Sequence, residues 1–302
     1  MMKLEGVAAF VSVAEAGSIS EAARRLGLAK SVVSERVAEL ERSLGASLMQ
    51  RTTRKLALTE DGEAFLLRAR RIVQETSEAA AELLERRGTL AGPLRLAGPV
   101  GFGILHLGPA ICSFLAAHPA IELTLDLDDR FVDVAADGYD AVIRHGPIRD
   151  NRLIAKRLGA SRRVLVASPA FLEANGTPAT VADLERCCAI LYTNRETDWR
   201  FHGGGGEVVV RPRAALRVNN GLVMRDAAIA GLGLTLLPTF FVHRELAAGT
   251  LVQVDVGAEA EGAELHIAYP ANRSASAKIA ALTVWLRKSF GEKSPLPFRG
   301  EG

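Results

Sequence analysis

The sequence predicts an α/β protein with a small helical head, one long helix, and a larger body in which strands and helices alternate. Two observations support this prediction. Apolar residues recur at helical spacing as far as residue 87, with short breaks at glycines, and after the Gly92-Pro93 pair strand-like runs alternate with helical ones. At 302 residues, the chain is long enough for two or three domains with cores of their own.

The composition is that of an ordinary globular protein. Hydrophobic residues make up 48% of the chain and charged residues 24%, which excludes disorder and fibrous repeats. The formal net charge is only +2, so any surface that attracts nucleic acid must be local. No secretion signal and no membrane span are expected, because charges interrupt the apolar N-terminal stretch and no long apolar run follows it. The three cysteines match neither a zinc site nor a disulfide framework, which favours the reducing cytoplasm.

The first 27 residues predict two short helices in close succession. The apolar residues of the first helix form one stripe, and Gly17 suits the left-handed position at its end. Ser18 and Glu21 have the spacing of a capping box, which would start the second helix at once. Gly27 is placed to end that second helix.

A third helix follows, and its two faces differ in character. The apolar face consists of Val33, Val37, Leu40 and Leu44. The polar face, near the N-terminal end, consists of Lys30, Ser31, Ser34 and Glu35. Residues 18–37 therefore have the layout of a helix-turn-helix, whose second helix enters the DNA major groove. Helical hairpins are also common in other proteins, so the spacing alone leaves both interpretations open.

Residues 48–59 predict a short β-hairpin that would form a wing beside these helices. Apolar residues flank a tip that carries three cations, Arg51, Arg54 and Lys55. A solvated loop is the simpler interpretation. The position of this hairpin directly after a helix-turn-helix instead favours contact of its tip with DNA phosphates or the minor groove.

A long helix is expected from Thr59, its N-cap, to about Arg87. From Phe65 to Leu83 its apolar and small residues are spaced alternately four and three apart, which predicts a seam for a second helix. Packing on the chain's own body is the alternative. Two paired helices would place two recognition helices on a DNA site with dyad symmetry.

The body beyond the linker alternates strands and helices. "PLRLAG", "AIELTLDLDD", "YDAVIRHG", "RRVLVASP" and "ELHIAYP" predict strands, "ILHLGPAICSFLAAH" predicts a helix, and "FVDVAADG" predicts a short helix. "GPVGFG" lacks the ordered G-x-G-x-x-G of a dinucleotide site, and "HGGGGE" reads as a hairpin turn. The histidines are scattered, so we expect no catalytic residues, no metal and no cofactor.

Residues 17–62 contain four motifs: G-S-x-x-x-A-A, S-x-x-[VI]-x-x-L-E, L-G-x-x-L and R-T-x-R-x-x-x-L-T-x-x-G. Together these motifs resemble the N-terminal domain of LysR-type transcriptional regulators. Farther along, "ADGYDAVIRHG" and "AAIAGLGLTLLP" look like the family's effector-binding domain, so the resemblance covers the whole chain. Glu35 departs from the family, which often has a basic residue there. Its carboxylate would accept from cytosine N4, or would simply pair with Arg24 or Arg36.

The resemblance implies the fold class and the organisation of the chain. It implies a winged helix-turn-helix DNA-binding domain over residues 1–59, a linker and dimerisation helix over 60–88, an effector-binding domain over 92–292 and a flexible tail over 293–302. The effector domain would have two Rossmann-like lobes, as in periplasmic binding proteins, with lobe I at 92–161 and 265–292 and lobe II at 162–264. The expected function is that of a cytoplasmic transcription regulator that assembles as a dimer or tetramer. Its partners would be double-stranded DNA, a small-molecule effector and RNA polymerase, with no membrane involved.

The resemblance also implies which residues line the effector cleft. Carried over, they are Pro99, Val100, Gly101 and Phe102 at a helix start, Arg144 and Gly146 after a strand, and Asn219 and Asn220 before a second-lobe helix. Backbone N–H groups at a helix start suit a carboxylate or phosphate. Pro99 weakens this role because it has no N–H, and Arg144 would alternatively be a structural arginine satisfied by carbonyls.

Two rival functions are less consistent with the sequence. A solute-binding protein with the same two lobes would need a secretion signal and no winged head. An oxidoreductase would need a nucleotide-binding glycine loop.

Overall fold

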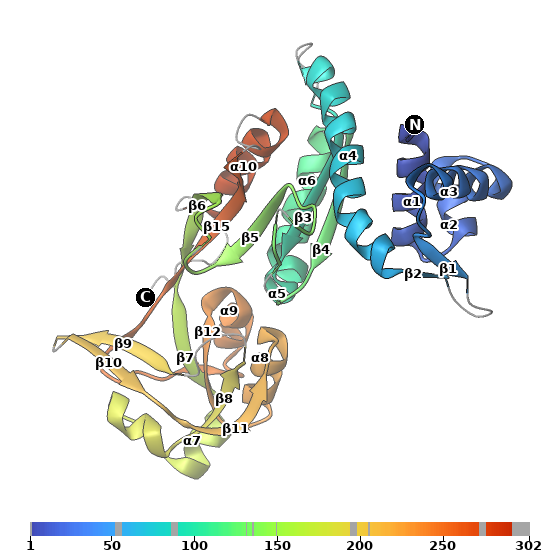
Figure 1. Ribbon diagram of the computed structural model, residues 1–302. Coiled ribbons are helices and arrows are strands. Elements are labelled where there is room, and N and C mark those ends of the chain that lie inside the picture. Colours follow the sequence, from blue (N-terminus) through green and yellow to red (C-terminus); the bar gives the residue numbers. More distant parts are fainter. Residues whose placement is uncertain are drawn as a thin grey trace. The chain divides into compact units, whose positions relative to one another are not determined.

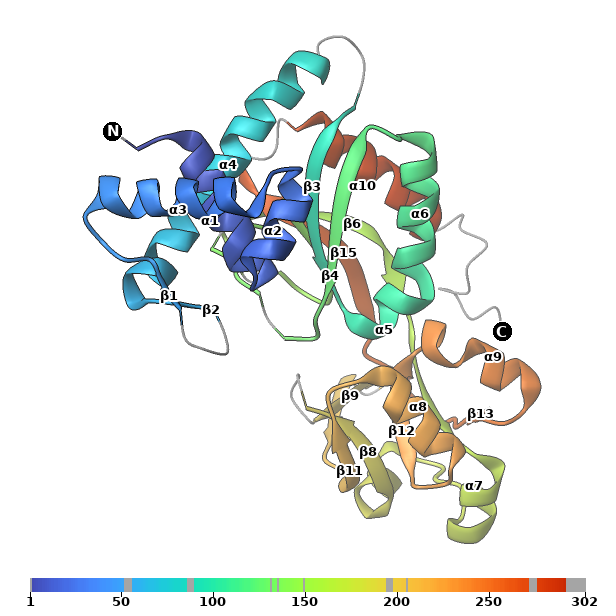
Figure 2. The same cartoon turned by 90° about the vertical axis from the view of Figure 1, so that its right-hand side faces the viewer.

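The computed structural model describes residues 2–51, 56–85, 90–130, 132–134, 136–148, 150–193, 198–204, 206–271 and 276–291. The chain divides into two compact units. The first contains residues 1–94 with the short segments 120–122 and 135–139, and the second contains the remainder. Figures 1 and 2 show the elements of both units from two sides.

Three helices form the head of the first unit: α1 (Leu4–Ala16), α2 (Ile19–Leu26) and α3 (Lys30–Leu44). As predicted, α1 and α2 end at Gly17 and Gly27, both with φ of 63°. The helices enclose a core that includes Phe10, Ala22 and Val33. Small residues allow the helices to cross closely, since a Cβ at Gly6 would lie 3.1 Å from the Arg36 carbonyl oxygen.

The capping box predicted at the start of α2 is not formed. Ser18 is the N-cap residue, but its side chain accepts no hydrogen bond there. The Glu21 carboxylate instead accepts from Arg24 and Arg25, at 2.7 and 3.2 Å. These arginines lie about one turn further along the helix, where they compete with the N-cap backbone for the carboxylate.

The predicted hairpin is confirmed as β1 (Met49–Arg51) and β2 (Leu56–Leu58), which pair antiparallel with Met49 opposite Leu58. The tip, residues 52–55, lies outside the described residues. The predicted N-cap of the long helix α4 (Glu60–Glu85) is also confirmed, because the Thr59 hydroxyl accepts from the Gly62 N–H at 2.9 Å.

The predicted seam of α4 has two parts. Ala69 is buried, and Phe65, Ile72 and Val73 pack against the core of the head, so the first part stabilises the chain's own first unit. Farther along, Thr76 and Ala79 are exposed. Packing on the chain's own body therefore explains the first half of the pattern, and self-association through the second half stays a prediction.

One five-stranded sheet has the order β4-β3-β5-β15-β6. Its strands are β3 (Gly92–Gly98), β4 (Ile121–Leu127), β5 (Ala141–His145), β6 (Leu153–Ser161) and β15 (Ala263–Pro270). A helical run follows β3, made of α5 (Val100–Phe102), a π-helical turn (Gly103–Leu107) and α6 (Gly108–Ala117). The helix α10 (Ala277–Phe290) contacts β6 and α6.

The short helix predicted for "FVDVAADG" is wrong for its described residues. Residues 132–134 and 136–138 form turns and irregular backbone, with Gly138 at φ of 74°. A segment this short, with β-branched Val132 and Val134, gains too few helical hydrogen bonds to offset nucleation.

The other five-stranded sheet has the order β11-β8-β12-β7-β13. Its strands are β7 (Arg163–Ala167), β8 (Cys188–Tyr192), β11 (Arg213–Val218), β12 (Leu234–Pro238) and β13 (Val252–Gln253). The accompanying helices are α7 (Pro169–Asn175), a 3-10 turn (Val181–Arg186), α8 (Gly221–Ile229) and α9 (Thr239–Ala248).

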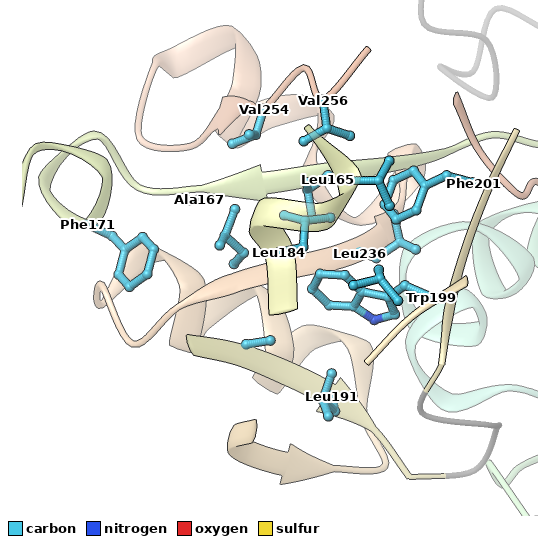
Figure 3. Packing of buried hydrophobic residues seen from close by; sticks show 14 residues of the cluster. Leu165, Ala167, Phe171, Leu184, Leu191, Trp199, Phe201, Leu236, Val254 and Val256 are labelled. Atoms are coloured by element: carbon cyan, nitrogen blue, oxygen red, sulfur yellow. The ribbon is translucent and has the colours of Figure 1, made fainter. Parts of the chain in front are cut away.

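A small third sheet, β10-β9-β14, shares a hydrophobic core with the sheet that contains β7, β8 and β12. It consists of β9 (Trp199–Gly203), β10 (Gly206–Val210) and β14 (Glu259–Ala260). Figure 3 shows Trp199 and Phe201 beside Leu165 and Leu236 of the larger sheet. The glycine-rich segment between β9 and β10 joins two antiparallel strands, which confirms the predicted hairpin.

The chain passes twice between the two large sheets, from β6 to β7 at Arg162 and back into β15. The boundaries given to the domains stay predictions. Among the described residues, the run Val100–Ala117 has the length and hydropathy, 1.7, of a membrane span. Its Phe102, Leu107 and Phe114 are buried within the protein, which accounts for that hydropathy.

Candidate functional site

The polar face of α3 is accessible. Lys30, Ser31 and Glu35 are exposed and Ser34 is half-buried, whereas Val33 and Val37 are buried beneath them. Ala29, the N-cap residue, has no side-chain acceptor for the first N–H groups of the helix. The end of α3 that carries the predicted DNA contacts thus presents polar side chains together with a helix start suited to phosphate.

Glu35 makes an ion pair other than the two considered from the sequence. Its carboxylate accepts from Arg42 at 3.0 Å, and Arg24 binds Glu21 instead. The side chains of Arg42 and Glu35 are 68% and 67% exposed, so this ion pair contributes little to stability. The Glu35 carboxylate can therefore exchange Arg42 for a base edge at low cost.

Glu41 and Gly62 position the wing, and sequence reasoning missed both roles. The Glu41 carboxylate accepts from the backbone N–H groups of Leu48 and Met49, at 2.7 and 3.0 Å. A Cβ at Gly62 would collide with the Leu48 carbonyl, so only glycine allows α4 to pass this close. Both residues belong to the quoted motifs, which was the available signal. Arg54 and Lys55 lie outside the described residues, as does the side chain of Arg51, and their DNA contacts stay predictions.

Asp129 follows β4, and its carboxylate connects two of the predicted effector residues, Val100 and Asn220. The Val100 N–H donates to Asp129 Oδ1 at 3.0 Å. Asn220 also hydrogen-bonds to this carboxylate through its side chain. Burial raises the pKa of Asp129, and these two hydrogen bonds oppose the rise. Asp129 was missed from the sequence, where an aspartate in a loop carries no signal of its own.

Arg144 makes a carbonyl contact of the kind that a structural role predicts, and its contact with an effector stays a prediction. Its guanidinium donates to the Arg130 carbonyl oxygen at 2.8 Å. Burial lowers the pKa of Arg144, and the nearby carboxylates of Asp128 and Asp129 raise it. The neighbouring Asp128 forms an ion pair with Arg130 at 2.7 Å.

Three other expected effector residues have evident structural roles. The Phe102 ring is buried against Phe240 and Phe290, with ring centres 5.3 and 5.1 Å apart. Gly146 has a φ of 90° and donates its N–H to the Glu264 carbonyl oxygen at 2.8 Å. Asn220 is the N-cap of α8, where its Oδ1 accepts from the Leu222 and Val223 N–H groups at 3.0 and 3.3 Å.

The remaining three effector residues lie close to these or in the open. Gly101 is buried, Pro99 is the N-cap residue of α5, and Asn219 is exposed. A Cβ at Gly101 would lie 2.5 Å from the Phe241 ring, and so would a Cβ at Gly221. The ring thus lies close to both helix starts because both positions are glycine.

In the part of the chain that the structure describes, no three His, Cys, Asp or Glu side chains converge as metal ligands. Lysine, serine and glutamate side chains, which can hydrogen-bond to DNA, are instead accessible on α3. A helix-turn-helix with an accessible polar helix, a wing and an α/β body define a DNA-binding transcription regulator.

Both parts of the chain match models of one protein family. Residues 4–63 match the bacterial regulatory helix-turn-helix protein of the lysR family, and residues 87–291 match the LysR substrate binding domain. The chain belongs to the LysR family of transcriptional regulators, and it is a regulator rather than an enzyme.

Curated relatives and solved structures agree with this assignment. The chain is 33% identical to the regulator PtxR of Pseudomonas aeruginosa over 302 residues, which is 99% of this chain and 95% of PtxR. It is 31% identical to the regulator DmlR of Escherichia coli, with 97% and 96% covered. The full-length structure of the Vibrio cholerae virulence activator AphB aligns with a TM-score of 0.61 at 26% identity, over 94% of this chain and 98% of AphB. CrgA of Neisseria meningitidis aligns with a TM-score of 0.57 at 28% identity, over 93% and 95%.

Proposed function

We propose that this regulator reads a dyad-symmetric promoter site and changes its grip on that site when a small molecule binds between the two lobes of its body. The observation that carries the proposal is the group around Asp129, in which residues of both large sheets meet at two helix starts. A ligand shifts such an arrangement only through its differential affinity for two shapes of the body.

On the DNA side, Lys30, Ser31, Ser34 and Glu35 contact base edges or the groove, and Arg51, Arg54 and Lys55 contact phosphates or the minor groove. The exposure of the α3 residues supports their part of this assignment. The exposed second part of the α4 seam, with Thr76 and Ala79, supports self-association as a dimer or tetramer. RNA polymerase is the expected partner at the promoter, and the cytoplasm the expected location.

On the ligand side, the effector contacts the stretch from Pro99 to Phe102, Arg144, Gly146, Asn219 and Asn220. Val100, Gly101 and Asn220 are the members of this set best supported by their surroundings, since they adjoin Asp129 or Phe241.

The DNA-binding half of the proposal is tested by selecting bound genomic fragments with the purified protein. Replacement of Arg54 by Ala should weaken binding to all sequences alike and lower the slope of log affinity against log salt by about 0.9. Replacement of Ser34 by Ala is the matched control, because it should change the preferred sequence with little change in slope. A loss confined to one sequence in the Arg54→Ala variant would contradict a backbone contact.

The effector half follows from the same selection, because genes beside the bound fragments suggest the metabolite. Adding that metabolite should alter the protection pattern on the selected DNA, and Asn219→Leu should weaken this response without changing DNA affinity. An Asn219→Leu protein that responds at the wild-type metabolite concentration would argue against the proposed contact.

A further inference from the structure

Asp129 occupies the position that an anionic ligand of the proposed effector site would need. Its Oδ1 accepts from the Val100 N–H at 3.0 Å, and Val100 begins the helical run after β3. Pro99, directly before it, has no N–H to offer. One backbone donor for a carboxylate or phosphate at this helix start, the Val100 N–H, is therefore already bonded within the chain itself.

The start of α8 is satisfied in the same way. The Leu222 and Val223 N–H groups donate to Asn220 Oδ1. The side chain of Asn220 also hydrogen-bonds to Asp129. Since Val100 follows a strand of one large sheet and Asn220 follows a strand of the other, the Asp129 carboxylate connects both helix starts.

An aromatic ring, that of Phe241, occupies the space beside these donors. The Phe241 ring lies where a Cβ at Gly101 or Gly221 would be 2.5 Å from its carbon atoms. A ligand that reaches the two helix starts must therefore displace or stack against an apolar ring, not only compete for N–H groups.

The charges around Asp129 do not favour a second anion. Asp128 is paired with Arg130 at 2.7 Å, and the Arg144 guanidinium donates to the Arg130 carbonyl oxygen. The positive charge of Arg144 acts to lower the pKa of both aspartates and so favours their ionised forms. An incoming carboxylate would meet Asp129 as a like charge, in a half-buried setting where such repulsion is weakly screened.

We propose that Asp129 is a built-in anion that excludes carboxylate and phosphate groups from this position, so that the effector meets it with a hydrogen-bond donor or a positive charge. The inference rests on the proposed function, because it names the ligand chemistry of the same site. It makes Asp129 a specificity-determining residue, with Val100 and Asn220 holding its carboxylate in place.

The test removes the built-in anion and supplies a free one. In the full-length protein, Asp129→Ala is compared with the wild type and with Asp128→Ala, which removes the neighbouring carboxylate paired with Arg130. Sodium acetate replaces sodium chloride at constant ionic strength, and the thermal unfolding midpoint is recorded. Acetate should raise the midpoint of Asp129→Ala by about 3 °C, whereas the midpoints of the wild type and Asp128→Ala should not move. An equal rise in all three proteins, or no rise in Asp129→Ala, overturns the proposal.

A second measurement separates this inference from the proposed function. Protection of the selected DNA by Asp129→Ala is measured with and without acetate. If acetate raises the midpoint but leaves protection unchanged, Asp129 is the built-in anion and the site has no effector role. If acetate does nothing to Asp129→Ala while a metabolite alters wild-type protection, the effector role stands and the assignment of Asp129 fails.

Discussion

The DNA-binding head and the effector-binding body treat their polar groups in opposite ways. On α3 the side chains of Lys30, Ser31 and Glu35 extend into solvent above a buried apolar face. In the body, the Val100 N–H and the Asn220 side chain are already bonded to Asp129. A surface that binds a polyanion gains from donors exposed in advance. A site with internally bonded donors admits only a ligand that replaces those bonds, which favours selectivity over affinity.

The two regions also differ in how their close contacts are distributed along the chain. In the head, Gly62 meets the backbone of Leu48, a nearby residue of a neighbouring motif. In the body, Gly101 meets the side chain of Phe241, far along the sequence. A rigid local contact suits a reading head, and a contact with a ring that can turn suits a site that must rearrange.

The largest expected effect comes from replacing these two glycines by alanine. Gly62→Ala forces a methyl group into the Leu48 carbonyl and should lower the free energy of unfolding of the head by about 3 kcal/mol. Gly101→Ala meets only the far edge of the Phe241 ring, so the loss should be smaller. Thermal unfolding of both variants measures this, with exposed Glu63→Ala as the control in the same turn as Gly62. Equal losses would remove the distinction between a rigid and a yielding contact.

The next effect concerns the anchor of the wing. Glu41→Ala leaves the Leu48 and Met49 N–H groups without their carboxylate and should destabilise the head by about 2 kcal/mol. Hydrogen exchange at those two amides should accelerate, and DNA affinity should fall as the wing loses its position. Glu41→Gln keeps one side-chain oxygen as an acceptor. Its stability and its amide exchange rates should therefore lie between those of Glu41→Ala and the wild type. Unchanged exchange at both amides would show that the strand pairing alone holds the wing.

Much of the head was predictable from sequence because its determinants are local. Glycines at Gly17 and Gly27, the N-cap at Thr59 and the hairpin all lie within a few residues of the structure they produce. The capping box predicted at Ser18 failed because Glu21 accepts from two arginines on its own helix instead of from the N-cap backbone. A motif cannot show which of several nearby partners a carboxylate will take.

The body was predictable only as an alternation of strands and helices. Its central contacts join Val100 to Asp129 and Gly101 to Phe241, and no periodicity connects those positions. Val132 and Val134 show that prediction from local pattern is limited in a related way. Their apolar spacing is typical of a short helix, but the segment forms irregular backbone and a turn, with Val134 buried. Such outcomes depend on tertiary packing, which outweighs the propensity of a short segment.

A smaller effect should separate base reading from stability within the head. Glu35→Ala removes an exposed ion pair with Arg42 and should leave the unfolding midpoint almost unchanged. If Glu35 accepts from a cytosine, discrimination at one position of the selected site should fall by about 1–3 kcal/mol. Selection with the variant measures this change, and Arg42→Ala is the control that breaks the same pair without removing the acceptor. Identical selected sequences for Glu35→Ala and the wild type would assign Glu35 to the ion pair alone.

The smallest expected effect is a pH dependence of the stability of the body, caused by a buried histidine. Burial lowers the pKa of His106 below its ordinary value of 6.5, and the hydrogen bond that its Nε2 donates to the Phe240 carbonyl oxygen opposes this shift. His243 and Arg244, on the helix that faces it, further disfavour the charged ring. Below about pH 6.5 the unfolded chain therefore binds a proton that the folded chain does not. The stability of the body should fall as the pH drops through this value, and the loss should be complete below the lowered pKa.

His106→Phe keeps a ring against Phe102 and Phe240 but removes the proton-binding group. The difference in unfolding free energy between neutral and mildly acidic solution should therefore shrink in this variant. Because the first unit contains no histidine between Met1 and Leu94, its own unfolding should not respond to pH in this range. A His106→Phe protein with the full wild-type pH dependence would place the responsible proton elsewhere in the body.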